Sequence, residues 1–213
     1  MFCAQNSLPD AQDICQRPGG LGLTRRGLAL CDFPPQANIV DVGCGTGASV
    51  RLLRKEGYCG IGLEKTVQAC DIPQVQGLAE ALPFTPDSLD GILCECVLSL
   101  LPEPAMILKN FYQVCRIGGH LLLSDLYRKN NESSSSGGLF SRQKMETALQ
   151  DAGWQVTFFE DHSPALKEYA ANLLWYGRQA KDSWPPKICG EIAWRDCGYG
   201  LWIARKDVRT EAT

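Results

Sequence analysis

The chain has 213 residues, of which 45% are hydrophobic and 21% charged, and its formal net charge is −3 at pH 7. The length is typical of one globular domain, and the balance of charge does not predict strong non-specific nucleic-acid binding, which needs basic patches. The longest apolar run, residues 91–101, is interrupted by Glu95 and is too short to span a bilayer. The first residues lack the basic segment and apolar core of a signal peptide, so we expect a cytoplasmic protein without a nucleic-acid or membrane partner.

Strands and helices are expected to alternate along the chain. The first half predicts a helix over residues 21–32, a strand over 37–42, a helix over 48–56, a strand over 58–63, a short helix within 65–76 and a strand near Val75. The second half predicts a strand over 89–94, a helix over 102–114, a strand over 120–126, a polar loop over 130–138, a helix over 141–152, a strand over 154–160, a helical stripe over 166–177 and a strand over 200–204. This alternation is typical of a mostly parallel α/β sheet.

The strongest local signal is the segment DVGCGTG, residues 41–47, between a predicted strand and a predicted helix. Glycines allow a tight turn and the close approach of a ligand, and ligands of open α/β sheets bind beyond the carboxyl ends of the strands. Ala48 takes the place of the third glycine of the dinucleotide fingerprint, although the looser form of that fingerprint tolerates alanine. Asp41 could attract a cation, and S-adenosylmethionine carries two. The segment therefore favours S-adenosylmethionine over a nicotinamide dinucleotide.

A second signal is Glu64, which ends the second predicted strand 23 positions after Asp41. A carboxylate at that place can accept hydrogen bonds from both hydroxyls of a ribose, at about 1.5–3 kcal/mol for each bond to a charged group. Glu64 thus supports the binding of an adenosine, but it does not by itself separate the two cofactors.

Six segments in consistent order resemble the class I S-adenosylmethionine-dependent methyltransferases. They are DVGCGTG (41–47), GIGLE (60–64), GLAEALPF (77–84), SLDGILCECVLSLLPE (88–103), RIGGHLLLSDLY (116–127) and GYGLWIARK (198–206). The resemblance covers about residues 25–206 and is greatest to the small-molecule branch that includes quinone-biosynthesis and arsenite methyltransferases. It implies a Rossmann-like, seven-stranded, mostly parallel sheet with helices on both faces and an antiparallel last strand.

The resemblance also implies a cofactor site. Asp41, Gly43, Gly45 and Gly47 would surround the methionine part, Glu64 would hold the ribose, and Ala79 would contact adenine through its backbone. Leu78 stands where many relatives have an aspartate that faces the adenine amino group, so adenine recognition is expected to use the backbone, apolar contact or Glu80. The expected cofactor-binding set is completed by Cys44, Leu78, Glu80 and Glu95. We divide the chain into an N-terminal lid segment, residues 1–33, and a methyltransferase domain, residues 34–213.

Candidates for chemistry on the acceptor are polar residues that follow predicted strands: Glu95, Asp125, Tyr127 and His162. Because methyl transfer from a sulfonium is a direct displacement, a general base is needed only if the nucleophile arrives protonated. His162 could be such a base or a surface histidine at a helix start. Glu95 could bind cofactor or substrate, or cap the next helix.

Eleven cysteines are the one unusual feature of the composition, and no two of them form a C-x-x-C motif. We expect reduced thiols that pack as small hydrophobes and no metal site. The resemblance to the arsenite branch implies a cysteine at the place of Cys96, and soft thiolates suit a metalloid, so Cys94 and Cys96 are candidates for such ligands.

We therefore expect an enzyme that transfers a methyl group from S-adenosylmethionine to a small-molecule acceptor and releases S-adenosylhomocysteine. The alternatives are a thiol-dependent metalloid-binding or metalloid-methylating protein and a nicotinamide-dependent oxidoreductase.

Overall fold

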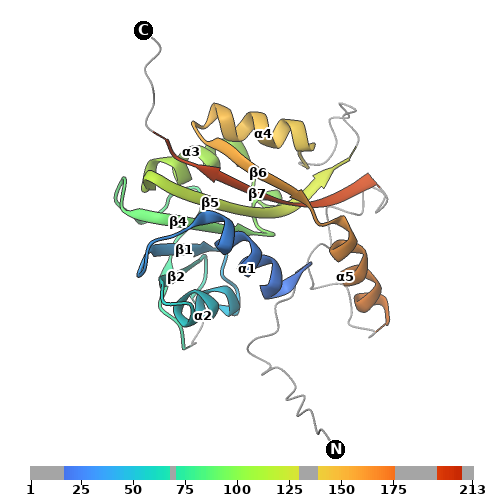
Figure 1. The fold of residues 1–213 in the computed structure, drawn as a ribbon, viewed down its shortest axis with the longest axis horizontal. Coiled ribbons are helices and arrows are strands. Elements are labelled where there is room, and N and C mark those ends of the chain that lie inside the picture. Colours follow the sequence, from blue (N-terminus) through green and yellow to red (C-terminus); the bar gives the residue numbers. More distant parts are fainter. Residues whose placement is uncertain (1–16, 68–70, 130–138, 176–195, 208–213) are drawn as a thin grey trace, which may run out of the picture.

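A computed structural model describes residues 17–67, 71–129, 139–175 and 196–207. In the order of the chain, its elements are α1 (Gly20–Cys31), β1 (Asn38–Val42), α2 (Ala48–Lys55), β2 (Cys59–Glu64), β3 (Gln74–Gln76), β4 (Leu89–Glu95), the 3₁₀ turn η2 (Leu98–Leu100), α3 (Pro104–Val114), β5 (Cys115–Arg128), α4 (Arg142–Asp151), β6 (Gln155–Asp161), α5 (Ser163–Trp175) and β7 (Cys197–Arg205) (Figure 1).

The strands form one seven-stranded sheet in the order β3-β2-β1-β4-β5-β7-β6. The four pairs from β3 to β5 are parallel, whereas β7 lies between β5 and β6 and is antiparallel to both. The predicted mostly parallel, Rossmann-like sheet with an antiparallel last strand is therefore confirmed. The carboxyl ends of β1, β2, β4, β5 and β6 all lie along one edge of this sheet.

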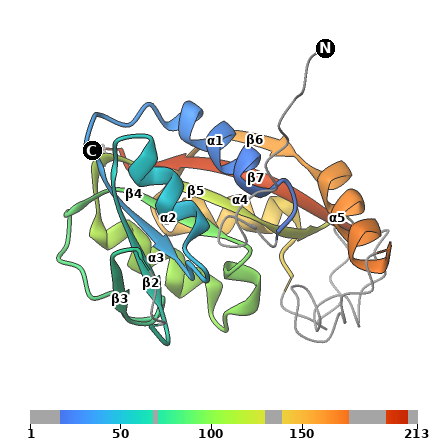
Figure 2. The same ribbon diagram turned by 90° about the horizontal axis from the view of Figure 1, so that it is seen from below.

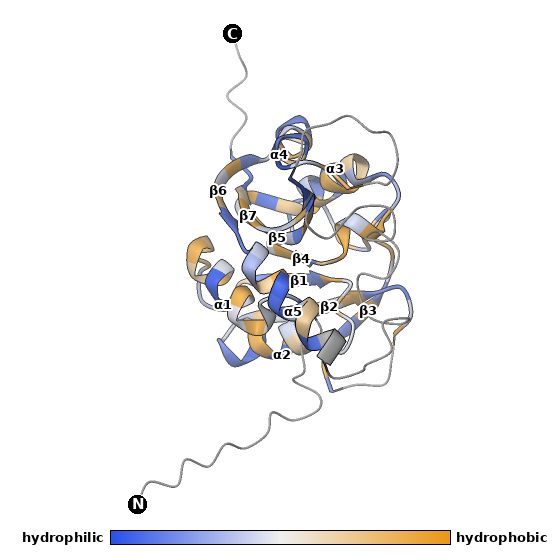
Figure 3. Cartoon of the chain, turned by 90° about the vertical axis from the view of Figure 1, so that its right-hand side faces the viewer, coloured by the Kyte–Doolittle hydropathy of each residue, from blue (hydrophilic) through white to orange (hydrophobic). Residues whose placement is uncertain are grey.

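Helices cover both faces of the sheet, as Figures 2 and 3 show from two directions: α3 and α4 lie on one face, and α1, α2 and α5 on the other. Two hydrophobic clusters fill the layers between sheet and helices, one containing Phe111 and Leu149, the other Leu28, Leu53 and Leu166. Because both faces are covered, the central strands are apolar without alternation, and all seven residues of β4 are buried.

Two regions differ from the sequence-based expectation. The described residues within 65–76 contain β3 and bends but no helix. The strand predicted over 120–126 begins earlier, at Cys115, so that Gly118 and Gly119 lie inside β5. Gly118 has a φ of +81° there, and a Cβ on Gly119 would come within 2.8 Å of the Asp90 carbonyl oxygen. These glycines therefore allow a close approach of β5 to β4 rather than ending an element. The loop predicted over 130–138 lies outside the described residues.

The described part of the predicted lid segment is a layer of the domain. In α1, Leu23, Leu28 and Cys31 are buried in the cluster on that face of the sheet. No helix within the described ranges is long and apolar enough to cross a membrane. Seven cysteines are described, and of these only Cys59 is exposed.

Candidate functional site

Three glycines shape the turn between β1 and α2. Gly43, Gly45 and Gly47 have φ values of +71°, +51° and +81°, in the left-handed region that favours glycine. A Cβ at Gly43 would lie 2.5 Å from a methyl carbon of Val97, and a Cβ at Gly47 would collide with Ile72. At Gly45 no atom lies within 4 Å of the Cβ position. The loop is thus closely packed on two sides and leaves open space in front of Gly45.

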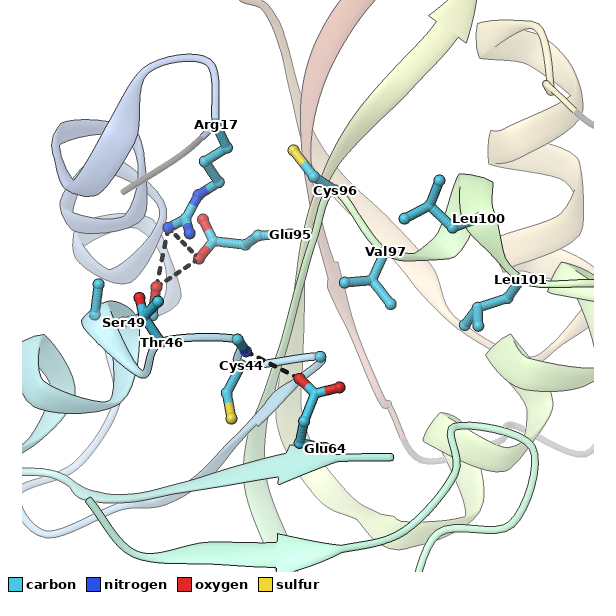
Figure 4. A pocket seen from close by; sticks show the side chains of 13 residues that line it. Arg17, Cys44, Thr46, Ser49, Glu64, Glu95, Cys96, Val97, Leu100 and Leu101 are labelled. Carbon is cyan, nitrogen blue, oxygen red and sulfur yellow. Dashed lines mark hydrogen bonds and ion pairs between the residues drawn. The ribbon is translucent and has the colours of Figure 1, made fainter. Parts of the chain in front are cut away.

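A pocket of about 440 Å³ occupies this space, at the carboxyl ends of β1, β2 and β4. Figure 4 shows its walls, with the glycine loop and Glu64 below and the residues after β4 on the far side. The residues that line it are Arg17, Gly43, Cys44, Gly45, Thr46, Ala48, Ser49, Glu64, Glu95, Cys96, Val97, Leu100 and Leu101.

Glu64 is fixed at the mouth of the pocket by the glycine loop. Its Oε2 accepts a hydrogen bond from the Gly45 N–H at 3.0 Å, and its Oε1 accepts one from the Lys65 N–H at 3.2 Å. A carboxylate has about four acceptor positions, so both oxygens keep capacity for a ligand. The arrangement brings together the two strongest signals of the sequence, the glycine loop and the acid that ends β2.

Glu95 joins the segment before α1 to the pocket. Its Oε2 lies 2.6 Å from Nη2 of Arg17, and it also accepts hydrogen bonds from the hydroxyls of Thr24 and Ser49, each at 3.1 Å. The Glu95 side chain is 1% exposed and that of Arg17 is 13% exposed. Arg25 and Arg26 also belong to the predicted lid segment. Unlike Arg17, they form exposed ion pairs on the surface.

Asp41 lies in β1, beneath the glycine loop, and does not itself line the pocket. Burial, together with the nearby carboxylates of Glu95 and Glu64, raises the pKa of this carboxyl to about 8, while the Arg17 guanidinium opposes the rise. A cation that entered the pocket would favour the ionised form of Asp41 and lower its pKa.

Asp125 holds the turn that forms the far wall. The backbone N–H and hydroxyl of Ser99, in η2, donate to the two carboxylate oxygens of Asp125 at 2.8 and 2.7 Å. Burial raises the pKa of Asp125 to about 6, against the effect of these hydrogen bonds. The structure therefore places Asp125 behind the pocket wall, where it positions η2.

Two other catalytic candidates lie at the same sheet edge but outside the pocket. His162 contacts the Glu160 carboxylate through Nε2 at 3.1 Å, and Glu160 also pairs with Arg26. Tyr127 packs edge-on against Phe159 and Trp202, and burial raises the pKa of its phenol. β5 and β7 lie between β4 and β6 in the sheet, so His162, which follows β6, is separated from the residues after β4 by two strands.

The predicted adenine-binding residues form the turn after β3. Leu78 bridges to Ala81, Ala79 is buried, and the Glu80 carbonyl accepts a hydrogen bond from Asn110 at 2.7 Å. The Gly77 N–H donates to the Glu64 carbonyl at 3.0 Å, which places this turn beside the mouth of the pocket. Leu78, Ala79 and Glu80 do not line the pocket itself.

The cysteine candidates point to opposite faces of the sheet. Cys94 is buried in the cluster under α3, whereas Cys96 belongs to the other cluster and reaches the pocket. Cys96 Sγ lies 2.9 Å from the Tyr199 hydroxyl. Burial raises the pKa of both thiols well above the usual range, so both stay protonated at neutral pH. Within the described ranges no three His, Cys, Asp or Glu residues form a possible metal site. Cys44 lines the pocket, with its sulfur 3.6 Å from the Gln74 side-chain nitrogen.

Sequence reasoning missed several lining residues: Thr46, Ala48, Ser49, Val97, Leu100 and Leu101. They follow the carboxyl ends of β1 and β4, so the rule that ligands bind beyond strand ends could have found them. Thr24 lies in α1 and donates a hydrogen bond to Glu95. It does not follow a strand, so this rule could not have found it.

The sheet order and the pocket at the glycine loop define the class I methyltransferase fold. Residues 40–123, less than half of the chain, match the family model described as "Methyltransferase domain". The fold resembles that of Haemonchus contortus phosphoethanolamine N-methyltransferase 2 in complex with S-adenosyl-L-methionine, with a TM-score of 0.69 and 16% identity over 90% of this chain and 54% of the other.

Two curated relatives match parts of the sequence. The arsenite methyltransferase of Rattus norvegicus is 39% identical over 54 residues, which are 25% of this chain and 14% of the relative. The ubiquinone biosynthesis O-methyltransferase of Photorhabdus laumondii subsp. laumondii is 24% identical over 103 residues, 42% of this chain and 43% of the relative. The chain thus spans less than half the length of these relatives.

Proposed function

We propose that this protein is an S-adenosylmethionine-dependent methyltransferase that acts on a small-molecule acceptor in the cytoplasm. One observation carries the proposal: the Glu64 carboxylate accepts the Gly45 N–H at 3.0 Å where the glycine loop leaves a pocket open. An adenosine ribose needs an anchored acceptor pair, and the methionine part of the cofactor needs backbone that a side chain does not cover. The Glu64 carboxylate supplies the acceptors and Gly45 the uncovered backbone, and a hydrogen bond joins these two residues.

The pocket residues fit the cofactor chemically. Glu64 would accept hydrogen bonds from the ribose hydroxyls, and the backbone at Gly45 would lie against the methionine part. The carboxyl of Asp41, which is mostly protonated at neutral pH, would ionise beside the cations of the cofactor and favour their binding, whereas Glu95 already pairs with Arg17. Arg17, which pairs with Glu95, is the cationic side chain of the described pocket lining. Its guanidinium would bind the carboxylate of the methionine part. We assign Arg17 to the closure of this side of the pocket, which it lines.

When bound, the cofactor supplies an electrophilic methyl group, which a lone pair of the acceptor displaces to leave S-adenosylhomocysteine. The chain contributes binding, orientation and exclusion of water. Among the described lining residues, the carboxylates are Glu64 and Glu95, and both already accept hydrogen bonds from the protein. We therefore assign both to binding rather than to proton transfer.

The test is calorimetric titration of Glu64→Ala and Glu64→Gln with S-adenosylmethionine. Loss of the charged acceptor should weaken binding by about 1.5–3 kcal/mol, or more if both hydroxyl bonds are lost, with Gln retaining part of the affinity as a neutral acceptor. Glu56→Ala, a surface change in an exposed ion pair, is the matched control. Unchanged affinity in both Glu64 variants would contradict the ribose assignment, and a preference for NADH would support the oxidoreductase alternative.

A further inference from the structure

The two walls of the pocket differ in chemistry. Arg17, Ser49 and Glu64 form one side, whereas Val97, Leu100 and Leu101 form the other (Figure 4). The groups of the polar side already bond one another or the glycine loop. The apolar side presents hydrocarbon to the pocket, so a ligand that fills the space must meet both.

Leu100 is an exposed apolar side chain inside a pocket. It is 53% exposed, while its neighbour Leu98 is 1% exposed and anchors the turn in the core. Val97 directly precedes η2 and Leu100 ends it, and both side chains line the same side of the pocket. Val97 is the member that adjoins the glycine loop, since it meets the Cβ position of Gly43. Leu100 therefore extends the apolar face away from the cofactor-binding loop.

The exposure of Leu100 is built into the fold. Asp125, which is fully buried, receives two hydrogen bonds from Ser99, and the Leu100 N–H donates to the Val97 carbonyl at 2.9 Å. A buried carboxylate is costly unless it is hydrogen-bonded, and this one is used to hold the turn. The apolar face is thus presented in a fixed position beside the proposed site of methyl transfer.

We propose that the face formed by Val97 and Leu100 binds an apolar part of the methyl acceptor. The acceptor class is then a small molecule with an alkyl or aromatic group near the atom that is methylated, rather than a wholly polar one such as phosphoethanolamine. This inference rests on the proposed function. It selects among acceptors that the cofactor site alone does not distinguish.

The test uses 1-alkanols from 1-butanol to 1-octanol as probes, titrated by ligand-observed NMR against protein saturated with S-adenosylhomocysteine. Each added methylene should tighten binding by about 3-fold to 4-fold, which corresponds to about 0.8 kcal/mol per buried CH₂. Leu100→Ser should weaken 1-octanol by about tenfold and leave the affinity for S-adenosylhomocysteine unchanged. Met106→Ser is the control, because Met106 is 44% exposed but lies on α3 outside the pocket lining.

Three results would overturn the proposal: no dependence on chain length, the same dependence in Leu100→Ser, or loss of alkanol binding on saturation with S-adenosylhomocysteine. The last result, with weaker S-adenosylhomocysteine binding by Leu100→Ser, would assign the face to the cofactor. Failure of S-adenosylhomocysteine to bind at all would instead contradict the proposed function. The alkanol series on the cofactor-free protein would then still show whether Leu100 forms an apolar site.

Discussion

Along the carboxyl edge of the sheet, the described residues form a pocket in one half, called here the open half, and bond one another in the other, called here the closed half. At β1, β2 and β4, the glycine loop leaves a pocket next to Glu64 and Glu95. At β5, β7 and β6, the polar side chains bond one another, as in the 3.1 Å contact between His162 and Glu160 and the bond from Ser163 to Asp161. Both halves carry acids at strand ends. The comparison indicates that strand ends bring acids to this edge in both halves, and that the glycine loop leaves the space beside Glu64 and Glu95.

The largest expected effect is on the free energy of unfolding, when the ion pair of the open half is removed and compared with that of the closed half. Glu95→Ala removes a buried carboxylate that accepts from Arg17, Thr24 and Ser49, so the free energy of unfolding should fall by about 3–5 kcal/mol. Glu160→Ala, the matched change in the closed half, removes a carboxylate that is 36% exposed and should cost at most about 1 kcal/mol. Denaturant unfolding measures both, and equal losses would contradict the contrast.

A second prediction concerns the pH dependence of stability in the open half. The pKa of Asp41 is about 8 in the folded protein and about 3.9 in an unfolded chain. The folded state thus binds one more proton between these values, and stability falls as pH rises. Between pH 6 and 8 the loss due to Asp41 should be about 2 kcal/mol.

Asp41→Asn should remove most of this slope, measured by denaturant unfolding at pH 6, 7 and 8. The corresponding change in the closed half, Asp161→Asn, should leave the slope in place, because the pKa of Asp161 is lowered by its hydrogen bonds to Ser163 and the carboxyl stays ionised throughout this range. A slope that persists in Asp41→Asn would show that another group causes it.

The smallest expected effect is that of His162→Ala. His162 lies outside the pocket and contacts the exposed Glu160, so stability should change by less than about 1 kcal/mol and the affinity for S-adenosylmethionine should not change. Calorimetry and denaturant unfolding test both statements. A weaker affinity for the cofactor would mean that the closed half reaches the site.

The sequence predicted the parts of the site that depend on local structure. The glycines of residues 41–47 and the acid at the end of β2 are local signals, because a turn and a strand end can be read from neighbouring residues. The pair formed by Arg17 and Glu95 joins positions 78 residues apart, and no local pattern encodes it.

The side-chain contacts of the closed half could not be predicted either, because they also join residues far apart in the sequence. β7, from the end of the chain, lies between β5 and β6 and brings Gly198 against the Tyr127 ring. The partners of Tyr127 and Asp161 therefore depend on strand order. Asp125 was expected to act on a substrate, but its partner Ser99 lies in a turn that the strand and helix patterns did not include. The fold class could still be predicted, because the alternation of elements and the order of the motifs do not depend on which side chains become partners.

The most direct test of the account is titration of the wild-type chain and Gly45→Val with S-adenosylmethionine, with NADH as the competing ligand. A valine at Gly45 would place its side chain in the open space of the pocket without meeting another residue at its Cβ, although its φ of +51° makes some loss of stability expected. We predict saturable binding of one S-adenosylmethionine per wild-type chain, and its loss in a Gly45→Val protein that is still folded. Binding that Gly45→Val leaves intact, or binding of NADH alone, would contradict the account.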